Sequence, residues 1–366
     1  MSPAEHPAKI LILGEARVVH AQRWARYFRE RGWIVRWLSF APVPPGVEAE
    51  AIGGTYLSRA AAIVLAVRRV RRIVREFAPD IVSSLFVPDY GWLGALVGAR
   101  PLVVSAWGSD VLIQPEKSPL HRRRVRHVLS RADHLFTDAD VLARRMRQLG
   151  APSAKITVAP LGVEDSWLAV GENRQEEPRP TVTVIQNRRL EPLYRVETLL
   201  EAAAQIEKSA SGQYRFVVIG EGSQRARLGR LADRLHLGTC LQFVPWLPSS
   251  DLRQRLADAD LYISTAASDG TSVSLLEAMA AGCFPIATDL PANCEWIEPG
   301  GNGLLFPVGD AGALAQQIER AAGDAVLREN ARARNRQIIT SRARWHDNME
   351  QVEAVMANVI EECRRG

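Results

Sequence analysis

The feature that most constrains the fold is a regular alternation of short apolar runs with helical patterns. The first run covers residues 9–13 and ends at Gly14, and the helical pattern over 20–31 stops at Gly32. The N-terminal half continues with the apolar runs 34–40, 80–86 and 101–107 and the helical segment 58–77. Such alternation is typical of a parallel sheet with helices on both faces.

The alternation restarts after a polar, proline-bearing stretch at 171–180. The second series has strand-like runs at 181–187, 214–220, 241–245 and 261–265, and helical patterns at 196–208, 223–236, 249–258 and 273–281. Two doubly wound, Rossmann-like α/β domains are therefore predicted, at 1–168 and 178–343, and 366 residues suit two domains. A last helix at about 344–366 is expected to cross back to the first domain. Because ligands bind beyond the carboxyl ends of parallel strands, two facing domains would place the site in a cleft between them.

Charge divides unevenly between the two halves. Residues 1–170 hold 24 Lys and Arg against 15 Asp and Glu, whereas the remainder holds 22 against 26. Arginines gather at 68–75 and again at 122–126, which would attract phosphates or an anionic membrane, although a solvated helix face explains them equally well. The start lacks the features of an export signal and the four cysteines form no C-x-x-C pair, which favours a cytoplasmic protein, at most peripheral on the inner face of the plasma membrane.

Several motifs are missing, and each excludes a function class. The loop after residue 13 lacks the later glycines of a pyrophosphate-binding G-x-G-x-x-G turn, which disfavours a nicotinamide or flavin cofactor. The sequence contains no G-x-x-x-x-G-K-[ST] loop, no G-x-S-x-G elbow and no His and carboxylate spacing typical of zinc. We therefore expect no cofactor and no obligatory metal, and no nucleic acid among the partners.

The most informative stretch covers residues 264–310. A strand ends near Thr265, a small polar loop follows, and a helix begins near Val273, so the backbone amides of Ser272, Val273 and Ser274 are expected to bind phosphate. Glu277, one turn further, suits the two hydroxyls of a ribose. On spacing alone, a capped surface helix is the alternative.

The segment DGTSVSLLEAMAAG, with Asp269 and Glu277 separated by seven residues, resembles the carboxylate motif of the retaining glycosyltransferases of family 4, which have the GT-B fold. Segments at 20–32, 188–202 and 217–228 support a resemblance over nearly the whole chain. It implies that Asp269 lies beside the transferred sugar, that Gly270, Thr271 and the amides of 272–274 bind the diphosphate, and that Glu277 binds the ribose. It also implies transfer from a nucleotide diphosphate sugar to a saccharide, lipid-linked or small-molecule acceptor, in the biosynthesis of cell-surface polysaccharide, glycolipid or a glycosylated metabolite.

Three positions depart from the family pattern. The first motif residue is usually Glu, and Asp269 is one methylene shorter. The family has Arg and, five residues on, Lys to stabilise the departing diphosphate; Arg189 matches, but the second position is Tyr194, and the neighbouring Arg195 is expected to replace it unless it only forms a surface ion pair. Trp107 stands where the family has His near C6 of the sugar, which favours a 6-deoxy sugar or a pentose unless the indole is a core residue.

The remaining candidates lie in the N-terminal domain. The resemblance places Gly14 and Glu15 at the donor diphosphate, gives Asp110 a role in orienting sugar or acceptor, and puts His20 and Ser109 near the acceptor. Two other functions remain open: a non-catalytic nucleotide-sugar-binding scaffold, since three motif positions depart from the pattern, and a sugar-nucleotide epimerase, which shares the two-domain fold.

Overall fold

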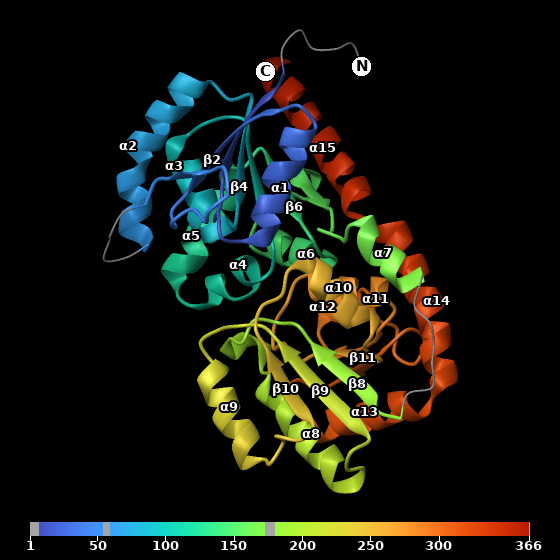
Figure 1. The fold of residues 1–366 in the computed structure, drawn as a ribbon. Helices are drawn as coiled ribbons and strands as arrows, with labels where there is room; N and C mark the ends of the chain where they lie inside the picture. The colour runs from blue at the N-terminus through green and yellow to red at the C-terminus, as the bar shows by residue number, and fades with distance from the viewer. Residues whose placement is uncertain (1–6, 54–58, 173–179, 366) are drawn as a thin grey trace. The chain divides into compact units, whose positions relative to one another are not determined.

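The computed structural model describes residues 7–53, 59–172 and 180–365. It divides into two compact units, one formed by Met1–Leu161 with Met349–Gly366 and the other by Gly162–Asn348. Each unit contains one open sheet whose strands are all parallel, as Figure 1 shows.

Unit 1 has a seven-stranded sheet in the order β3-β2-β1-β4-β5-β6-β7. The strands are β1 (Lys9–Leu13), β2 (Ile34–Ser39), β3 (Glu50–Ala51), β4 (Ile81–Leu85), β5 (Leu102–Ala106), β6 (His134–Thr137) and β7 (Ile156–Val158). The helices are α1 (Val19–Glu30), α2 (Arg59–Phe77), α3 (Trp92–Val97), α4 (Ser109–Leu112), α5 (Pro119–Arg131), α6 (Asp140–Gln148) and most of α15 (Trp345–Arg365).

Helices cover both faces of this sheet, which is why its central strands are buried along their whole length. Every residue of β4 and β5 is buried. Apolar side chains of α2, α3 and α5 form one core with alternate residues of the strands, and Trp24 of α1 packs on Phe136 of β6 on the other face. Figure 1 shows α15 running beside α1, and Tyr27 of α1 donates a hydrogen bond to Glu353 of α15.

Unit 2 has a six-stranded sheet in the order β10-β9-β8-β11-β12-β13. The strands are β8 (Val182–Gln186), β9 (Tyr214–Ile219), β10 (Leu241–Val244), β11 (Leu261–Ser264), β12 (Phe284–Thr288) and β13 (Leu304–Phe306). The helices are α7 (Asp165–Glu172), α8 (Glu197–Ser209), α9 (Arg225–Arg234), α10 (Ser249–Ala257), α11 (Val273–Ala280), α12 (Pro291–Cys294), α13 (Ala311–Gly323) and α14 (Ala325–Arg342).

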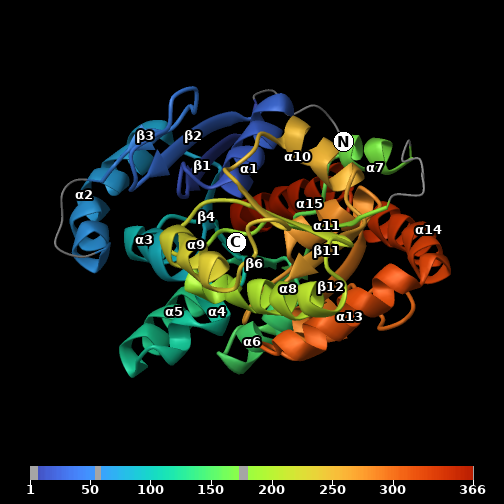
Figure 2. The ribbon, with the colours of Figure 1, turned by 60° about the horizontal axis from the view of Figure 1, so that its bottom comes forward.

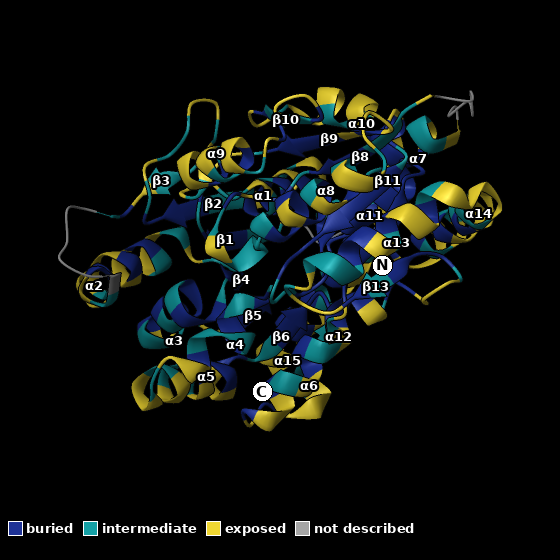
Figure 3. Cartoon of the chain, turned by 90° about the horizontal axis from the view of Figure 1, so that it is seen from below, coloured by how far each residue is buried: buried dark blue, intermediate teal, exposed yellow. Residues whose placement is uncertain are grey.

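The two faces of this sheet carry separate cores. Side chains of α8, α9 and α13 fill one of them, and Figure 2 shows α8 and α13 side by side. Side chains of α7, α10 and α11 fill the other. Figure 3 shows that α11 is mostly buried, whereas α5 and α9 present exposed outer faces. Because both faces of the sheet are packed, the loops that follow the central strands β8 and β11 begin from well-packed positions.

The predicted α/β class and the two doubly wound sheets are confirmed. The boundaries differ from those expected, because residues 162–168 and 344–348 belong to unit 2. Helix α7 accounts for the first difference, since its residue Trp167 is buried in the core of α10 and α11. Most of the linker predicted at 171–180 lies outside the described residues. Strands β12 and β13, which the apolar pattern did not separate from the motif around them, complete the second sheet.

The chain enters unit 2 at Gly162 and leaves it after Asn348. The first and last segments of unit 2 contact each other. Val163 and Arg344 form an isolated parallel bridge, and the Arg344 guanidinium donates two hydrogen bonds of 2.9 Å to Asp165. Gly162 has φ +60°, and a methyl group there would lie 2.5 Å from the carbonyl oxygen of Ala343. Only glycine fits this approach.

No helix within the described ranges is both long enough and apolar enough to cross a bilayer.

Candidate functional site

The candidate donor site in unit 2 lies where the strand order of the sheet reverses. Strands β8 and β11 are neighbours there, and the chain leaves them to opposite sides, which is where open α/β sheets bind ligands. Arg188 follows β8 and Asp269 follows β11. An Arg188 nitrogen lies 2.7 Å from an Asp269 carboxylate oxygen.

The Arg188–Asp269 pair is buried. Arg188 is 8% exposed, and the two side chains are 9% and 15% exposed. Burial raises the pKa of Asp269, and the Arg188 guanidinium opposes that rise. Gly220, which follows β9 and has φ +138°, lies close to the backbone of Arg188. A methyl group at this position would lie 2.6 Å from the Arg188 carbonyl oxygen, so the approach needs a glycine.

The loop from Asp269 to the start of α11 is fixed by side-chain hydrogen bonds. Ser272 is the N-cap of α11 and accepts a hydrogen bond from the backbone amide of Leu275. Arg188 also donates to the Ser272 hydroxyl. The Trp296 indole donates to Thr271 Oγ1 at 3.3 Å. The first turn of α11, including Val273 and Ser274, therefore begins beside Asp269, as the sequence predicted.

Glu277 belongs to the same polar cluster. Tyr262 on β11 is fully buried; burial raises its pKa, and the charges of Asp269 and Glu277 add to that rise while Arg188 opposes it. The charges of Arg188, Asp269 and Glu277 therefore all act on the Tyr262 hydroxyl. Sequence reasoning missed Tyr262, because its position inside an apolar strand resembles that of any core residue.

Arg189 and Arg195, the two cations predicted to stabilise the departing diphosphate, have other neighbours in this structure. The Arg189 side chain is 75% exposed and lies 3.6 Å from Glu191. Arg195 has the left-handed φ of 44°, and its guanidinium lies against Gly309, where a methyl group would be 2.8 Å from a guanidinium nitrogen. A third arginine, Arg188, is the one that pairs with Asp269.

Tyr194 lies next to Arg188. The Arg188 guanidinium stacks on the Tyr194 ring, with its central carbon 4.5 Å from the ring centroid. Thr265 donates a hydrogen bond of 2.6 Å to the Tyr194 carbonyl oxygen, which joins this turn to the end of β11. The aromatic side chain at the expected lysine position therefore supports the arginine that pairs with Asp269.

Unit 1 has a second polar cluster, again where the strand order reverses, between β1 and β4. Gly14 and Glu15 follow β1, and the Gly14 carbonyl oxygen accepts a hydrogen bond of 2.9 Å from the Trp37 indole. Tyr90 donates to Glu15 at 3.2 Å. The predicted residues of the first loop are therefore held by aromatic side chains from β2 and from the turn after β4.

His20 and Trp107 are brought together in this cluster. Their rings make an edge-to-face contact with centroids 6.2 Å apart. Trp107 is half-buried at the end of β5, and Ser109 begins α4 just beyond it. His20 and Trp107 were predicted to have separate roles, and the fold places their rings in contact.

Asp110 has a different role from the one expected. It is fully buried and accepts hydrogen bonds from the backbone amides of Val87, Trp107 and Gly108. Burial raises its pKa to about 6, although those amides oppose the rise. A carboxylate enclosed in this way does not reach a sugar, so we correct the predicted catalytic role: Asp110 shapes the loops that carry Trp107.

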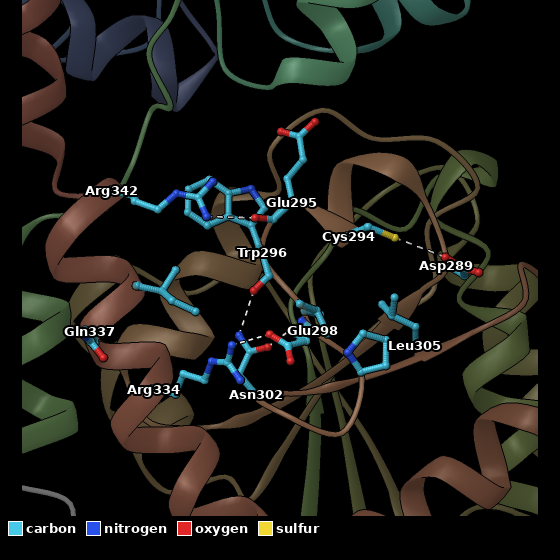
Figure 4. Close-up of a pocket in the computed structure, with 13 residues that line it drawn as sticks. Asp289, Cys294, Glu295, Trp296, Glu298, Asn302, Leu305, Arg334, Gln337 and Arg342 are labelled. Atoms are coloured by element: carbon cyan, nitrogen blue, oxygen red, sulfur yellow. Dashed lines mark hydrogen bonds and ion pairs between the residues drawn. The ribbon is translucent and has the colours of Figure 1, made fainter.

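A pocket of about 870 Å³ lies on another part of unit 2, between α12, the loop before β13 and α14. Figure 4 shows Trp296 and Arg342 at one side and Arg334 and Asn302 at another. Arg342 stacks on the Trp296 ring at 4.6 Å. None of the predicted donor residues lines this pocket, and its connection with them is the Trp296 hydrogen bond to Thr271.

Comparison with protein families gives two matches. The family described as "Glycosyl transferases group 1" matches residues 171–338, and the one described as "Glycosyl transferase 4-like" matches residues 9–139. The first range contains Arg188, Asp269 and Glu277. The second contains the residues of the unit 1 cluster, among them Glu15, His20 and Trp107.

Among similar proteins is the putative colanic acid biosynthesis glycosyltransferase WcaL of Salmonella typhimurium, 27% identical over 67% of this chain and 60% of its own length. The amylovoran biosynthesis glycosyltransferase AmsK of Erwinia amylovora is 25% identical over 67% of this chain and 62% of its own. The chain thus spans about three fifths of the length of these relatives.

Two solved structures have the same fold. HepE of Anabaena, in complex with UDP-glucose, has a TM-score of 0.80 at 20% identity over 96% of this chain and 99% of that one. Sucrose-phosphate synthase from Thermosynechococcus elongatus has a TM-score of 0.81 at 17% identity over 97% of this chain and 100% of that one.

Proposed function

Because the chain belongs to the family 4 glycosyltransferases and has the GT-B fold, we propose that it transfers a sugar from a nucleotide diphosphate sugar to an acceptor. One observation carries the proposal: Asp269, paired with the buried Arg188, lies in the loop that leads into α11, the helix that carries Glu277, where the strand order of the sheet reverses. The names of the relatives, in colanic acid and amylovoran biosynthesis, favour a cell-surface polysaccharide as the product.

In this proposal the donor binds to unit 2. The diphosphate accepts hydrogen bonds from the backbone amides of Ser272, Val273 and Ser274, since the first amides of a helix have no partners within it. Glu277 accepts hydrogen bonds from the two ribose hydroxyls. Asp269 lies at the transferred sugar, and the acceptor binds to unit 1.

Transfer is proposed to retain the anomeric configuration and to need no divalent metal. The bond from the anomeric carbon to the diphosphate oxygen breaks, the acceptor oxygen forms the new bond on the same face of the sugar, and the acceptor's hydroxyl proton passes to the departing diphosphate. The developing negative charge on the diphosphate is stabilised by the amino end of α11. Arg189 is exposed in this structure, and it would have to turn from Glu191 to take part.

The test is the thermal stability of the protein with a panel of nucleoside diphosphates and nucleotide sugars, since a ligand at 100 times its dissociation constant stabilises a protein by about 2.7 kcal/mol. One strong responder, whose effect is lost in Glu277→Ala, is the expected result. Turnover of that donor in EDTA, with the anomer of the product read by NMR, then tests metal independence and retention. A panel without any responder contradicts the proposal, and binding without turnover over many acceptors favours a donor-binding scaffold.

We also propose that unit 1 docks on an anionic membrane carrying a lipid-linked acceptor. The outer face of α2 carries exposed Arg68, Arg69 and Arg72 next to Leu65, which is 62% exposed. Leu120, at the start of the basic helix α5, is 65% exposed. Apolar side chains among arginines suit a surface of anionic headgroups over acyl chains.

A further inference from the structure

We propose that Arg188 is a positioning residue of the donor site, which neutralises Asp269 and holds it so that a nucleoside diphosphate can bind at the amino end of α11. The inference rests on the proposed function, and it concerns a residue to which neither the motifs nor the family resemblance assigned a role. Arg188 is one position before the arginine that the family resemblance indicated.

The contacts of Arg188 support this role. One nitrogen of its guanidinium pairs with Asp269 at 2.7 Å and another donates to Ser272, the N-cap of α11. The plane of the group stacks on Tyr194 at 4.5 Å. Three contacts from two segments, the loop before α11 and the turn at Tyr194, orient the guanidinium, and they join the carboxylate to the start of the helix.

The charges explain why the pairing is needed. Asp269 and Glu277 both act on the Tyr262 hydroxyl, and Arg188 acts there with the opposite sign. Without Arg188, the Asp269 carboxylate would be uncompensated in the loop before α11, beside the helix end that has to receive an anionic diphosphate, and like charges repel strongly in a desolvated site. With Arg188 present, the positive end of α11 again favours an anion.

The side chain acts through Asp269 and does not bind the phosphate itself. Arg188 is 8% exposed and already engages the carboxylate, the Ser272 hydroxyl and the Tyr194 ring. The shorter side chain of Asp269 is consistent with this arrangement, since a fixed guanidinium stands directly against its carboxylate. Arg188 and Asp269 are therefore a matched pair.

The experiment is a double-mutant cycle on nucleoside diphosphate binding, measured by calorimetry with the diphosphate that stabilises the wild-type protein most. Arg188→Gln should weaken binding at least 10-fold, and Arg188→Lys should recover part of the loss. Asp269→Asn should change binding less than about 3-fold. Because the double variant lacks both charges, it should also bind within about 3-fold of the wild type, although without turnover. Arg215→Gln, at an exposed arginine of β9, is the matched control and should bind normally.

Unchanged binding by Arg188→Gln overturns the inference. So does a double variant that binds as weakly as Arg188→Gln, since that result indicates direct contact with the phosphate or a purely structural role.

A second measurement needs no ligand, and so separates this inference from the proposed function. In Arg188→Gln, Asp269 is buried without its counter-charge, which raises its folded-state pKa further. A raised carboxyl pKa costs stability as the pH rises through it, so Arg188→Gln should lose more stability relative to wild type at pH 8 than at pH 5. Asp269→Asn in the same background should remove that difference. A pH-independent loss contradicts the pairing even if donors bind, whereas a wild-type protein that binds no nucleotide contradicts only the proposed function.

Discussion

At the scale of single residues, the adjacent arginines 188 and 189 have different surroundings. Both follow β8, yet Arg188 is buried against Asp269 while Arg189 is exposed beside Glu191. The family resemblance selected Arg189 from its spacing. The role expected of Arg189 was to stabilise the diphosphate, whereas the contact with Asp269 belongs to Arg188, and only the tertiary structure shows it.

Asp110 is the residue for which a pH dependence follows directly. Its pKa in the folded protein, about 6, lies above its ordinary value because it is buried. Between about pH 4 and pH 7 the folded state therefore holds a proton that the unfolded state has lost, and stability falls as the pH rises through this range.

We expect the Asp110 carboxyl to titrate near 6 in ¹³C NMR spectra. The stability of the wild type relative to Asp110→Asn should fall by up to about 3 kcal/mol from pH 4 to pH 7, in urea unfolding experiments. Asp140→Asn, at an exposed carboxylate of α6, controls for the loss of one charge. A stability difference that is constant with pH would mean that the three backbone amides outweigh burial.

At the scale of elements, the Glu353 carboxylate links helix α15 to α1 and to the turn before β2, in addition to the ion pair between Arg364 and Asp80. Glu353 accepts hydrogen bonds from Tyr27 and Arg31 at 2.9 Å and from the Trp33 indole at 2.8 Å. These donors come from α1 and the turn before β2. Apolar residues of the helix, including Met356, complete the attachment.

Glu353→Gln should destabilise the protein by about 1–3 kcal/mol, because it removes the charge and turns one of two acceptor oxygens into a donor that faces N–H or O–H groups. Glu361→Gln on the same helix is the control, since Glu361 pairs only across the surface with Arg365 and such pairs contribute little. Equal midpoints of chemical denaturation for the two variants would show that apolar packing alone holds α15.

At the scale of the whole molecule, positive charge is concentrated in the N-terminal half. A field of that kind acts on partners and surfaces and does not determine the fold. The exposed arginines of α2 and the neighbouring exposed Leu65 are where we expect contact with anionic lipid.

The protein should float with vesicles containing phosphatidylglycerol and not with pure phosphatidylcholine. Because each basic residue near such a surface contributes about 1 kcal/mol, changing Arg68, Arg69 and Arg72 to Gln should weaken binding at least 10-fold. The same three changes at Arg227, Arg230 and Arg234, exposed on α9 of unit 2, give a control of equal net charge. Equal binding to both kinds of vesicle, or an equal loss in the control, would contradict docking through α2.

Local patterns by themselves determined the fold class, the two sheets, the start of α11 and the family, because periodicity, helix caps and motif spacing act over a few residues. Only the tertiary structure decided which arginine meets Asp269, that Asp110 is enclosed by backbone amides, that His20 contacts Trp107, and that α7 belongs to unit 2. Each of these depends on distant segments meeting at strand ends. Such contacts are set by strand order and side-chain direction, which no short stretch of sequence contains.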